Sequence, residues 1–257
     1  MIDSLFGSLL VRVLVLNPNT SPGITARLVA AAEAARAPDT ELIGLTAPRG
    51  VPYIATRAEA TIGAAVALEM LAERAHGFDA AVIAAFGDPG LGGARELFAQ
   101  PIVGLAEAGM LTACMLGARF AIVSFARALE PWYAECVAWH GLEQRCCGIR
   151  CLDRPFQSID DVQEEHADLL VELAERAVVE NGADVVVLAG APLAGLAAKV
   201  RDRLSVPAVD CMAAAVKQAE LLVGLNPRKA TAGTFRRPAA KPTTGLPRPL
   251  AAWIEHR

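Results

Sequence analysis

Two acidic side chains lie where short apolar segments end in the first half of the chain. Asp88 lies in the turn of residues 84–91 (AAFGDPGL), and Glu107 lies just past residues 102–105. A carboxylate beside a ligand can take a proton from a carbon next to a carbonyl group, or can bind an amide N–H. Helix capping is the alternative, and Asp88 before Pro89 is typical of it. Both residues are therefore candidate catalytic bases with a structural alternative.

Polar residues also end one apolar segment in each half. Asn17 falls in residues 16–21 (LNPNTS), and Ser124 is its counterpart in the second half. Each is either a turn residue or a contact to a ligand. The backbone amides of Phe125 and Ala126, at the expected start of a helix, favour a carboxylate or ureide oxygen at that point.

The loops around these residues supply further candidate contacts. Tyr53 and Arg57 lie in a loop that can close over a ligand, and a guanidinium group favours an anion. The turns that follow the second strand of each half give five more candidates for ligand binding: Phe86, Gly87, Gly190, Ala191 and Pro192. Ser21 has the side chain and position of a helix cap, and we assign it to that role. Asp210 is either the cap of the helix that follows it, which we prefer, or a general base or a group that binds an amide N–H.

Metal-binding and nucleotide-binding patterns are not evident in the sequence. The four histidines are scattered without an H-x-H or H-x3-H pair, and residues 146–151 (CCGIRC) have no second pair of ligands. Zinc sites usually combine two such pairs. No Gly-x-Gly-x-x-Gly or P-loop motif is present. We therefore expect no metal and no cofactor.

The elements that must hold these residues alternate between strands and helices. Short apolar segments predict strands at residues 12–16, 80–84, 102–105, 120–123, 185–188 and 208–210. Alanine-rich segments predict helices at residues 24–35, 58–74, 92–98, 161–179, 193–204, 212–222 and 250–256. This alternation is typical of α/β proteins with parallel sheets covered by helices.

The same order of segments occurs twice, which indicates a duplication. Residues 12–17 (RVLVLN) are echoed by 119–124 (RFAIVS), and 77–85 (GFDAAVIAA) by 182–190 (GADVVVLAG). Equivalent positions are separated by 105 to 107 residues throughout. A fixed offset between similar segments is the mark of an internal repeat. We expect two pseudo-symmetric lobes, with a ligand between them.

The repeat also predicts the domain organisation. Residues 11–115 form the first lobe, residues 116–225 the second, and residues 226–257 an irregular wrap that ends in a short helix and possibly packs back on the first lobe. Ligands of open α/β sheets lie beyond the carboxyl ends of the strands. Two facing lobes therefore bring Asn17 opposite Ser124 and Ala85 opposite Gly190.

Composition limits the partners of the chain. Its formal net charge is −4 and 54% of its 257 residues are hydrophobic, yet no basic block is present and no apolar stretch is long enough to span a bilayer. A nucleic acid or membrane partner is therefore not expected. The six cysteines do not form the framework of a disulfide scaffold, which is typical of a cytoplasmic protein.

Four motifs, taken in order, resemble the hydantoin and allantoin racemases of the aspartate/glutamate/hydantoin racemase superfamily. They are residues 16–21 (LNPNTS), 52–59 (PYIATRAE), 84–91 (AAFGDPGL) and 241–246 (KPTTGL). The resemblance implies two α/β lobes, a small-molecule substrate between them, no cofactor, and a homo-oligomer. It also implies two catalytic cysteines, one in each lobe, that exchange protons with opposite faces of the substrate.

The positions that the resemblance gives to those cysteines are Ala85 and Gly190 in this chain. Neither side chain can exchange a proton. We therefore expect an enzyme that acts by proton transfer next to a carbonyl on a ureide, hydantoin, or amino or dicarboxylic acid, without the two-cysteine mechanism. The alternatives are an isomerase, decarboxylase or hydrolase with a similar ligand, or a relative that only binds its ligand.

Overall fold

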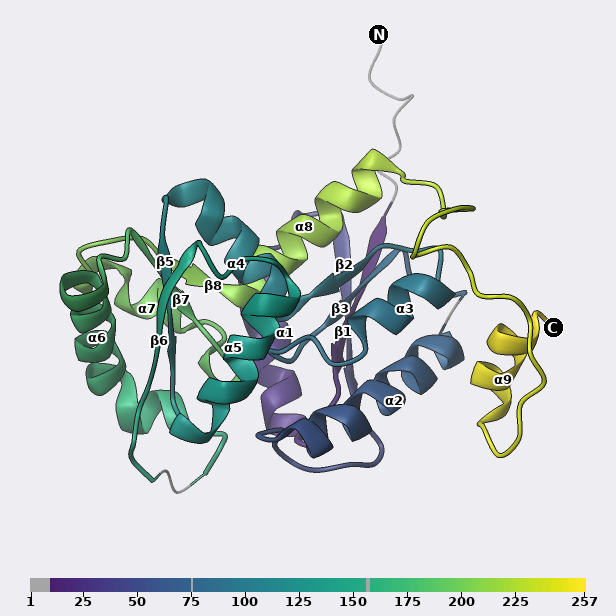
Figure 1. Cartoon of the computed structure of the whole chain (residues 1–257), viewed down its shortest axis with the longest axis horizontal. Helices are drawn as coiled ribbons and strands as arrows, with labels where there is room; N and C mark the ends of the chain where they lie inside the picture. The colour runs from purple at the N-terminus through teal and green to yellow at the C-terminus, as the bar shows by residue number, and fades with distance from the viewer. Residues whose placement is uncertain (1–9, 75, 156–157) are drawn as a thin grey trace, which may run out of the picture.

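Two four-stranded parallel sheets form the framework of the protein, as a computed structural model shows for residues 10–74, 76–155 and 158–257. The first sheet has the order β2-β1-β3-β4 and the second has the order β6-β5-β7-β8, so the two follow one plan (Figure 1). The predicted α/β class and the pair of pseudo-symmetric lobes are confirmed. The strands are β1 (Val11–Asn17), β2 (Thr40–Thr46), β3 (Ala80–Ile83), β4 (Ile102–Gly104), β5 (Phe120–Ser124), β6 (Cys146–Cys151), β7 (Val185–Leu188) and β8 (Ala208–Asp210).

Helices cover the faces of both sheets. The longer ones are α1 (Pro22–Ala35), α2 (Arg57–Arg74), α4 (Leu105–Leu116), α5 (Glu130–Trp139), α6 (Val162–Asn181) and α8 (Cys211–Leu225). The shorter ones are α3 (Leu91–Leu97), α7 (Leu196–Val200), α9 (Arg248–Glu255) and the 3-10 helices η1 (Arg127–Leu129), η2 (Ala191–Leu193) and η3 (Arg201–Arg203). Ser21 caps α1 by accepting a hydrogen bond from the Ile24 amide, and Asp210 caps α8, as their positions predict.

The repeated Gly-x-Asp segment has the same structural role in each lobe. The carboxylate of Asp79 accepts a hydrogen bond from the Arg12 amide at 2.8 Å, and that of Asp184 accepts one from the Arg119 amide at 2.9 Å. Each aspartate therefore ties the start of one strand to the start of its neighbour. This common use explains why the aspartate occurs in both copies.

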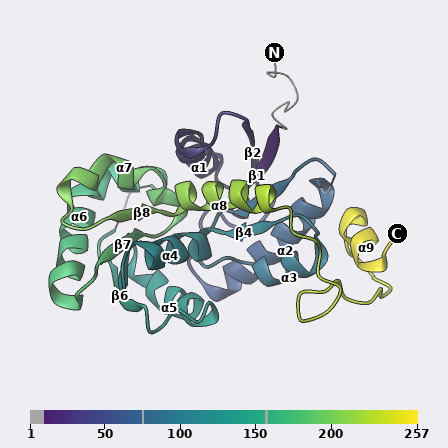
Figure 2. The ribbon, with the colours of Figure 1, turned by 90° about the horizontal axis from the view of Figure 1, so that it is seen from above.

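Two helices exchange lobes. α4 follows β4 of the first sheet but packs against β7 of the second, whereas α8 follows β8 of the second sheet and packs against β3 of the first. The two helices also pack against each other, as Figure 2 shows from above. Each of these two helices therefore packs on the sheet of the other lobe. A division of the chain at residues 115 and 225 separates α4 and α8 from the sheets that they cover.

The hydrophobic core has two parts, divided by the first sheet. In β1, Val13 and Val15 face a cluster that continues into the second lobe, whereas Leu14 and Leu16 face a cluster with α2 and α3. Alternation of side chains along a strand sends consecutive residues to opposite faces. The C-terminal helix α9 adds Leu250 to the second of these clusters and contacts α2.

The structure also departs from the sequence-based prediction in several elements. β2 and β6 were not predicted, since their sequences are interrupted by polar residues and glycine and their side chains are only partly buried. α4 and α5 were not predicted either, and the helix expected at residues 193–204 is broken into η2, α7 and η3. Residues 226–247 form neither helix nor strand. Among the described residues, no helix is long and apolar enough to cross a membrane.

Candidate functional site

A cavity lies between the lobes, beyond the carboxyl ends of the strands. Its volume is about 30 Å³, and both lobes contribute to its wall. It is lined by Asn19, Tyr53, Ile54, Ala85, Phe86, Phe125, Trp132, Tyr133, Ile159, Gly190, Ala191 and Pro192. Six of the nine residues expected to bind substrate are in this lining: Tyr53, Phe86, Phe125, Gly190, Ala191 and Pro192.

Ala85 and Gly190 line the same cavity, one from each lobe. The pseudo-symmetry therefore brings together the two positions that the sequence placed opposite each other. Within the described part of the chain no cysteine lines this cavity. The wall provides hydroxyl and amide side chains instead.

Gly190 has a backbone that excludes most other residues. Its φ of 111° and ψ of 140° lie in a region that side chains with a Cβ rarely adopt. A Cβ built on this residue lies only 2.8 Å from Cε1 of Phe125. The second lobe is thus shaped around a residue without a side chain, and a thiol here would need both a different backbone and a displaced Phe125.

The hydroxyl group of Tyr133 lies next to Gly190. It is 3.4 Å from the position that a Cβ of residue 190 would take. Tyr133 comes from α5 and is buried, and its hydroxyl is hydrogen-bonded to Ser124, whose Oγ also donates to the Ala189 carbonyl at 2.9 Å. Burial raises the pKa of Tyr133. The hydroxyl therefore stays protonated at neutral pH and is a hydrogen-bond donor rather than a base.

Aromatic rings close the cavity from both lobes. The rings of Phe86 and Tyr133 lie 4.5 Å apart between centroids, and those of Tyr53 and Phe125 lie 5.8 Å apart. Pockets for small ligands usually measure about 300–1,000 Å³, whereas 30 Å³ holds about one water molecule. A substrate therefore needs the Tyr53 loop or the lobes to separate before it can enter.

Asn17 does not line the cavity. Its side-chain amide donates to Asn19 Oδ1, to the Ser21 carbonyl and to Thr25 Oγ1, at 2.9–3.1 Å, and its Oδ1 accepts from the Asn19 amide. These bonds use the side chain to build the turn after β1. The residue that this turn presents to the cavity is Asn19, which the sequence analysis did not single out.

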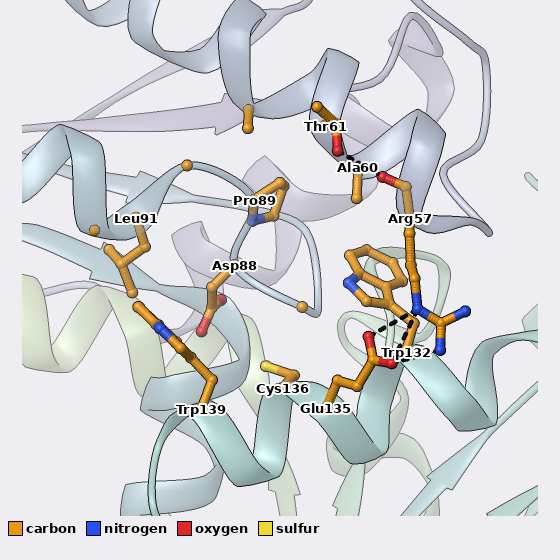
Figure 3. Close-up of a pocket in the computed structure, with 14 residues that line it drawn as sticks. Arg57, Ala60, Thr61, Asp88, Pro89, Leu91, Trp132, Glu135, Cys136 and Trp139 are labelled. Atoms are coloured by element: carbon orange, nitrogen blue, oxygen red, sulfur yellow. Dashed lines mark hydrogen bonds and ion pairs between the residues drawn. The ribbon is translucent and has the colours of Figure 1, made fainter.

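Ser124 and Gly87 are also absent from the lining. Ser124 acts on the cavity only through its hydrogen bond to Tyr133. Gly87 lies on the outer side of the turn after β3, where a Cβ would be 2.3 Å from the Trp132 ring. It belongs to a separate, solvent-open pocket of about 450 Å³ between α2, α3 and α5 (Figure 3).

The two candidate bases, Asp88 and Glu107, are not among the residues that line the cavity. The Asp88 carboxylate accepts hydrogen bonds from the Ala106 and Glu107 amides at 2.8 and 2.9 Å, so it caps α4 rather than α3, which immediately follows it. The Glu107 carboxylate is paired with Arg95. Both carboxylates have structural partners, and our proposal for catalysis does not use them.

Arg57, which the sequence places in a loop, is instead the first residue of α2, and it forms an ion pair with Glu135 of α5; both side chains are largely exposed. This pair joins the two lobes at the edge of the solvent-open pocket (Figure 3). It does not reach the cavity that Ala85 and Gly190 line. The loop after β2 thus presents Tyr53 to the cavity, and the start of α2 presents Arg57 to the second lobe.

Two cysteines of helices α4 and α8, Cys114 and Cys211, are not among the residues that line this cavity. Cys211 is buried and its Sγ donates to the Leu188 carbonyl at 3.4 Å, while Cys114 is partly buried on α4. Burial and the neighbouring Asp210 raise the pKa of Cys211 well above the ordinary value of a thiol. Such a group is a structural neutral thiol rather than an activated thiolate.

Comparison with known proteins agrees with the architecture of the two lobes. The model of the family "Asp/Glu/Hydantoin racemase" matches residues 13–219. A hydantoin racemase from Paenarthrobacter aurescens is 32% identical over 232 residues, which cover 90% of this chain and 98% of that protein. The solved structures of two allantoin racemases are similar to this one. That from Klebsiella pneumoniae is 36% identical in sequence, with a TM-score of 0.88 over 93% of this chain and 98% of that protein. That from Pseudomonas fluorescens is 32% identical, with a TM-score of 0.85 over 91% of this chain and 100% of that protein.

The fold of this chain, with its two four-stranded parallel sheets, is thus similar to that of the two allantoin racemases. The chain belongs to the Asp/Glu/hydantoin racemase family. Within that family it falls in the branch of the hydantoin and allantoin racemases, and it is a racemase-type enzyme.

Proposed function

We propose that this enzyme transfers a proton at a carbon next to a carbonyl group of a small ureide, hydantoin, or amino or dicarboxylic acid, and that it does so without a pair of cysteines. The observation that supports the proposal is the cavity that Ala85 and Gly190 share: the described residues of its wall include no thiol, and the Tyr133 hydroxyl lies beside Gly190. The names of the similar proteins, hydantoin and allantoin racemase, support the choice of substrate class.

Tyr133 supplies the hydrogen-bond donor in this proposal. Loss of a proton beside a carbonyl gives an enolate, and a neutral hydroxyl in a dry cavity stabilises the enolate oxygen by donating a hydrogen bond to it. Because burial raises the pKa of Tyr133, the hydroxyl keeps its proton throughout, and water returns a proton to the carbon. Ser124, whose Oγ donates to the Ala189 carbonyl, neighbours this hydroxyl and acts as a positioning residue.

The base is then a water molecule or a group of the substrate itself. Among the described residues of the lining, none is a carboxylate, histidine or lysine. Catalysis by such a site relies on stabilising the enolate, and it suits substrates whose acidic carbon already loses a proton readily. Ring carbons of hydantoins, which lie beside a carbonyl, have this character.

Decarboxylation is the second candidate. A carboxylic acid with a second carbonyl one carbon away loses carbon dioxide and leaves the enolate directly, so no base is needed and only a proton donor remains to be supplied. The same lack of a base in the described lining favours this reaction. A malonate-type acid is the substrate class that it implies.

Exchange of the substrate proton in deuterium oxide tests the first candidate. The purified protein is incubated with L-5-substituted hydantoins, allantoin, aspartate and glutamate, and NMR follows the loss of the Cα–H signal. We expect exchange with at least one ureide or hydantoin above the rate without protein. Absence of exchange with all of them refutes proton transfer on these substrates. Release of carbon dioxide from 2-substituted malonates then identifies a decarboxylase, and stabilisation by ligand without turnover identifies a binding protein.

We further propose that the enzyme is a cytoplasmic homo-oligomer, on the basis of its resemblance to racemases of this branch. Exposed apolar side chains on α4 and α8, including Met115 and Leu221, are consistent with contacts between subunits. Light scattering coupled to size exclusion measures the mass directly, and a value near the 26.9 kDa of one chain refutes the oligomer.

A further inference from the structure

Three side chains with metal-binding atoms converge outside the interlobe cavity. They are Asp88 in the turn after β3, Cys136 on α5, and His140 at the end of α5. One ligand atom from each lies within 4.8 Å of the other two. Cys136 and His140 are four residues apart, which puts them on one face of the helix. The facing turn then supplies the carboxylate.

Burial fixes these side chains in place. The side chain of Asp88 is fully buried and that of His140 is 7% exposed. Asp88 Oδ2 lies 2.9 Å from His140 Nε2 while both carboxylate oxygens accept backbone amides of α4. The carboxylate and the imidazole ring are therefore held before any ion binds, which lowers the entropic cost of assembling a site.

A second carboxylate stands behind the histidine. Glu107 Oε1 lies 3.7 Å from His140 Nδ1, and Arg95 binds the same Glu107 carboxylate through two guanidinium nitrogens. Histidines that ligate a metal commonly direct their other ring nitrogen at a carboxylate, which orients the ring. His140 has this arrangement, because its Nε2 lies in the cluster with Asp88 and Cys136 while its Nδ1 faces the Glu107 carboxylate.

We propose that Asp88, Cys136 and His140 bind a divalent transition-metal ion of the zinc class, through Oδ2, Sγ and Nε2. Mixed oxygen, sulfur and nitrogen ligands suit zinc, whereas magnesium and calcium prefer oxygen alone. Tetrahedral zinc with ordinary bond lengths separates its ligand atoms by about 3.4–3.6 Å. The imidazole and the carboxylate need to move apart by only about 0.5 Å from their present contact to meet this geometry.

The three candidate ligand side chains are almost fully buried, but two of them border a pocket that is open to solvent. Asp88 and Cys136 both line the solvent-open pocket of about 450 Å³, and Figure 3 shows the Cys136 sulfur directed toward the Asp88 carboxylate there. Three protein ligands with one open position leave room for water or for a small anion. The site joins the turn of the first lobe to α5 of the second, so a bound ion ties the lobes together.

Sequence patterns did not reveal this site. A search for paired histidines or paired cysteines misses the combination Cys-x3-His, and the third ligand is 48 residues before Cys136 in the chain. Only the fold brings the turn after β3 against α5.

Zinc binding to the purified protein tests the proposal. After exposure to zinc and removal of loose ions by dialysis, we expect one equivalent of zinc per chain by elemental analysis. Cys136→Ala and His140→Ala should each weaken binding at least tenfold in competition with a chromogenic chelator, while Cys114→Ala and His256→Ala, which remove the same side chains elsewhere, should not. Cobalt should give a thiolate charge-transfer band that disappears in Cys136→Ala.

The variants are first compared with the parent by circular dichroism and thermal unfolding without metal, and Cys136→Ala is the informative variant if His140→Ala fails to fold. The proposal is overturned if the parent protein retains no zinc, or if Cys136→Ala retains as much as the parent. Both measurements are independent of catalysis, so they distinguish this site from the reaction proposed for the interlobe cavity.

Discussion

Replacing Gly190 by alanine tests whether the second lobe is shaped around a residue without a side chain. The φ of 111° costs about 1–3 kcal/mol for a residue with a Cβ. The new methyl group also meets Phe125 at 2.8 Å, and displacing a packed ring adds about 1–3 kcal/mol. We therefore expect Gly190→Ala to lower the free energy of unfolding by about 2–6 kcal/mol.

Thermal unfolding followed by circular dichroism measures this loss. For a chain of this size, the expected change corresponds to a fall in Tm of roughly 5–25 °C. Gly141→Ala is the matched control, because Gly141 also has a positive φ, of 68°, but a Cβ there has no neighbour within 4 Å. We expect the control to lose only the backbone part, about 1–2 kcal/mol.

A third variant separates the two causes. Phe125→Leu removes the ring that the new methyl group meets. We therefore expect Gly190→Ala to lower the free energy of unfolding by less in the Phe125→Leu background than in the parent protein. Equal losses for Gly190→Ala and Gly141→Ala would refute the role of Phe125. A stable Gly190→Ala would refute the whole argument, and a cysteine at this position would then be structurally acceptable.

Three further predictions concern the joints between elements and the thiols. Glu220→Gln should lower the free energy of unfolding by about 1–2 kcal/mol at neutral pH, because the Glu220 carboxylate accepts hydrogen bonds from the Ala37 amide and Thr40 Oγ1. Urea unfolding measures this loss, and Glu143→Gln, at an exposed position, is the control. Burial opposes ionisation of Glu220, but these bonds outweigh it and lower its pKa, so the folded state holds the proton less tightly than the unfolded chain. The advantage over Glu220→Gln is therefore complete above about pH 5 and shrinks as the pH falls through the folded pKa; a constant difference down to about pH 3 would contradict this assignment. Glu135→Gln removes an exposed ion pair and should leave the midpoint of urea unfolding unchanged; a clear fall in the midpoint would show that the pair holds the lobes together. Cys211 should resist iodoacetamide in the native protein and react after unfolding, as mass spectrometry of the peptides will show; rapid native labelling would instead identify an activated thiol.

The central strands β1, β3, β5 and β7 could be predicted from the sequence because each is a short apolar run whose residues are mostly buried. β7 and the edge strand β8 were predicted with the observed bounds, and the internal repeat led to the correct pairing of lobes. The edge strands β2 and β6 escaped because half-buried strands tolerate polar residues and glycine. The exchange of α4 and α8 between lobes leaves no local signal, since any apolar helix can cover either sheet.

The cavity was predicted in part for the same reason. Positions such as Ala85, Gly190 and Phe125 follow strands, so the topology fixes where they lie. Tyr133 comes from the middle of α5, and Asn19 enters through a turn that Asn17 organises; neither role can be inferred from spacing alone. The position of Asp88 before Pro89 predicts a cap for the helix that follows it. Its carboxylate instead accepts hydrogen bonds from α4, which is distant in sequence and adjacent in the fold.

The most direct test of thiol-free chemistry compares deuterium exchange at the substrate carbon in three proteins. They are the parent chain, a variant with all six cysteines replaced by alanine or serine, and Tyr133→Phe, which keeps the ring and removes only the hydroxyl. With a ureide or hydantoin that the parent exchanges, the cysteine-free protein should retain the rate within about threefold, whereas Tyr133→Phe should lose at least about tenfold, as is typical for the removal of one acid–base or oxyanion-binding group. Loss of exchange in the folded cysteine-free protein, with Tyr133→Phe unchanged, would contradict the account.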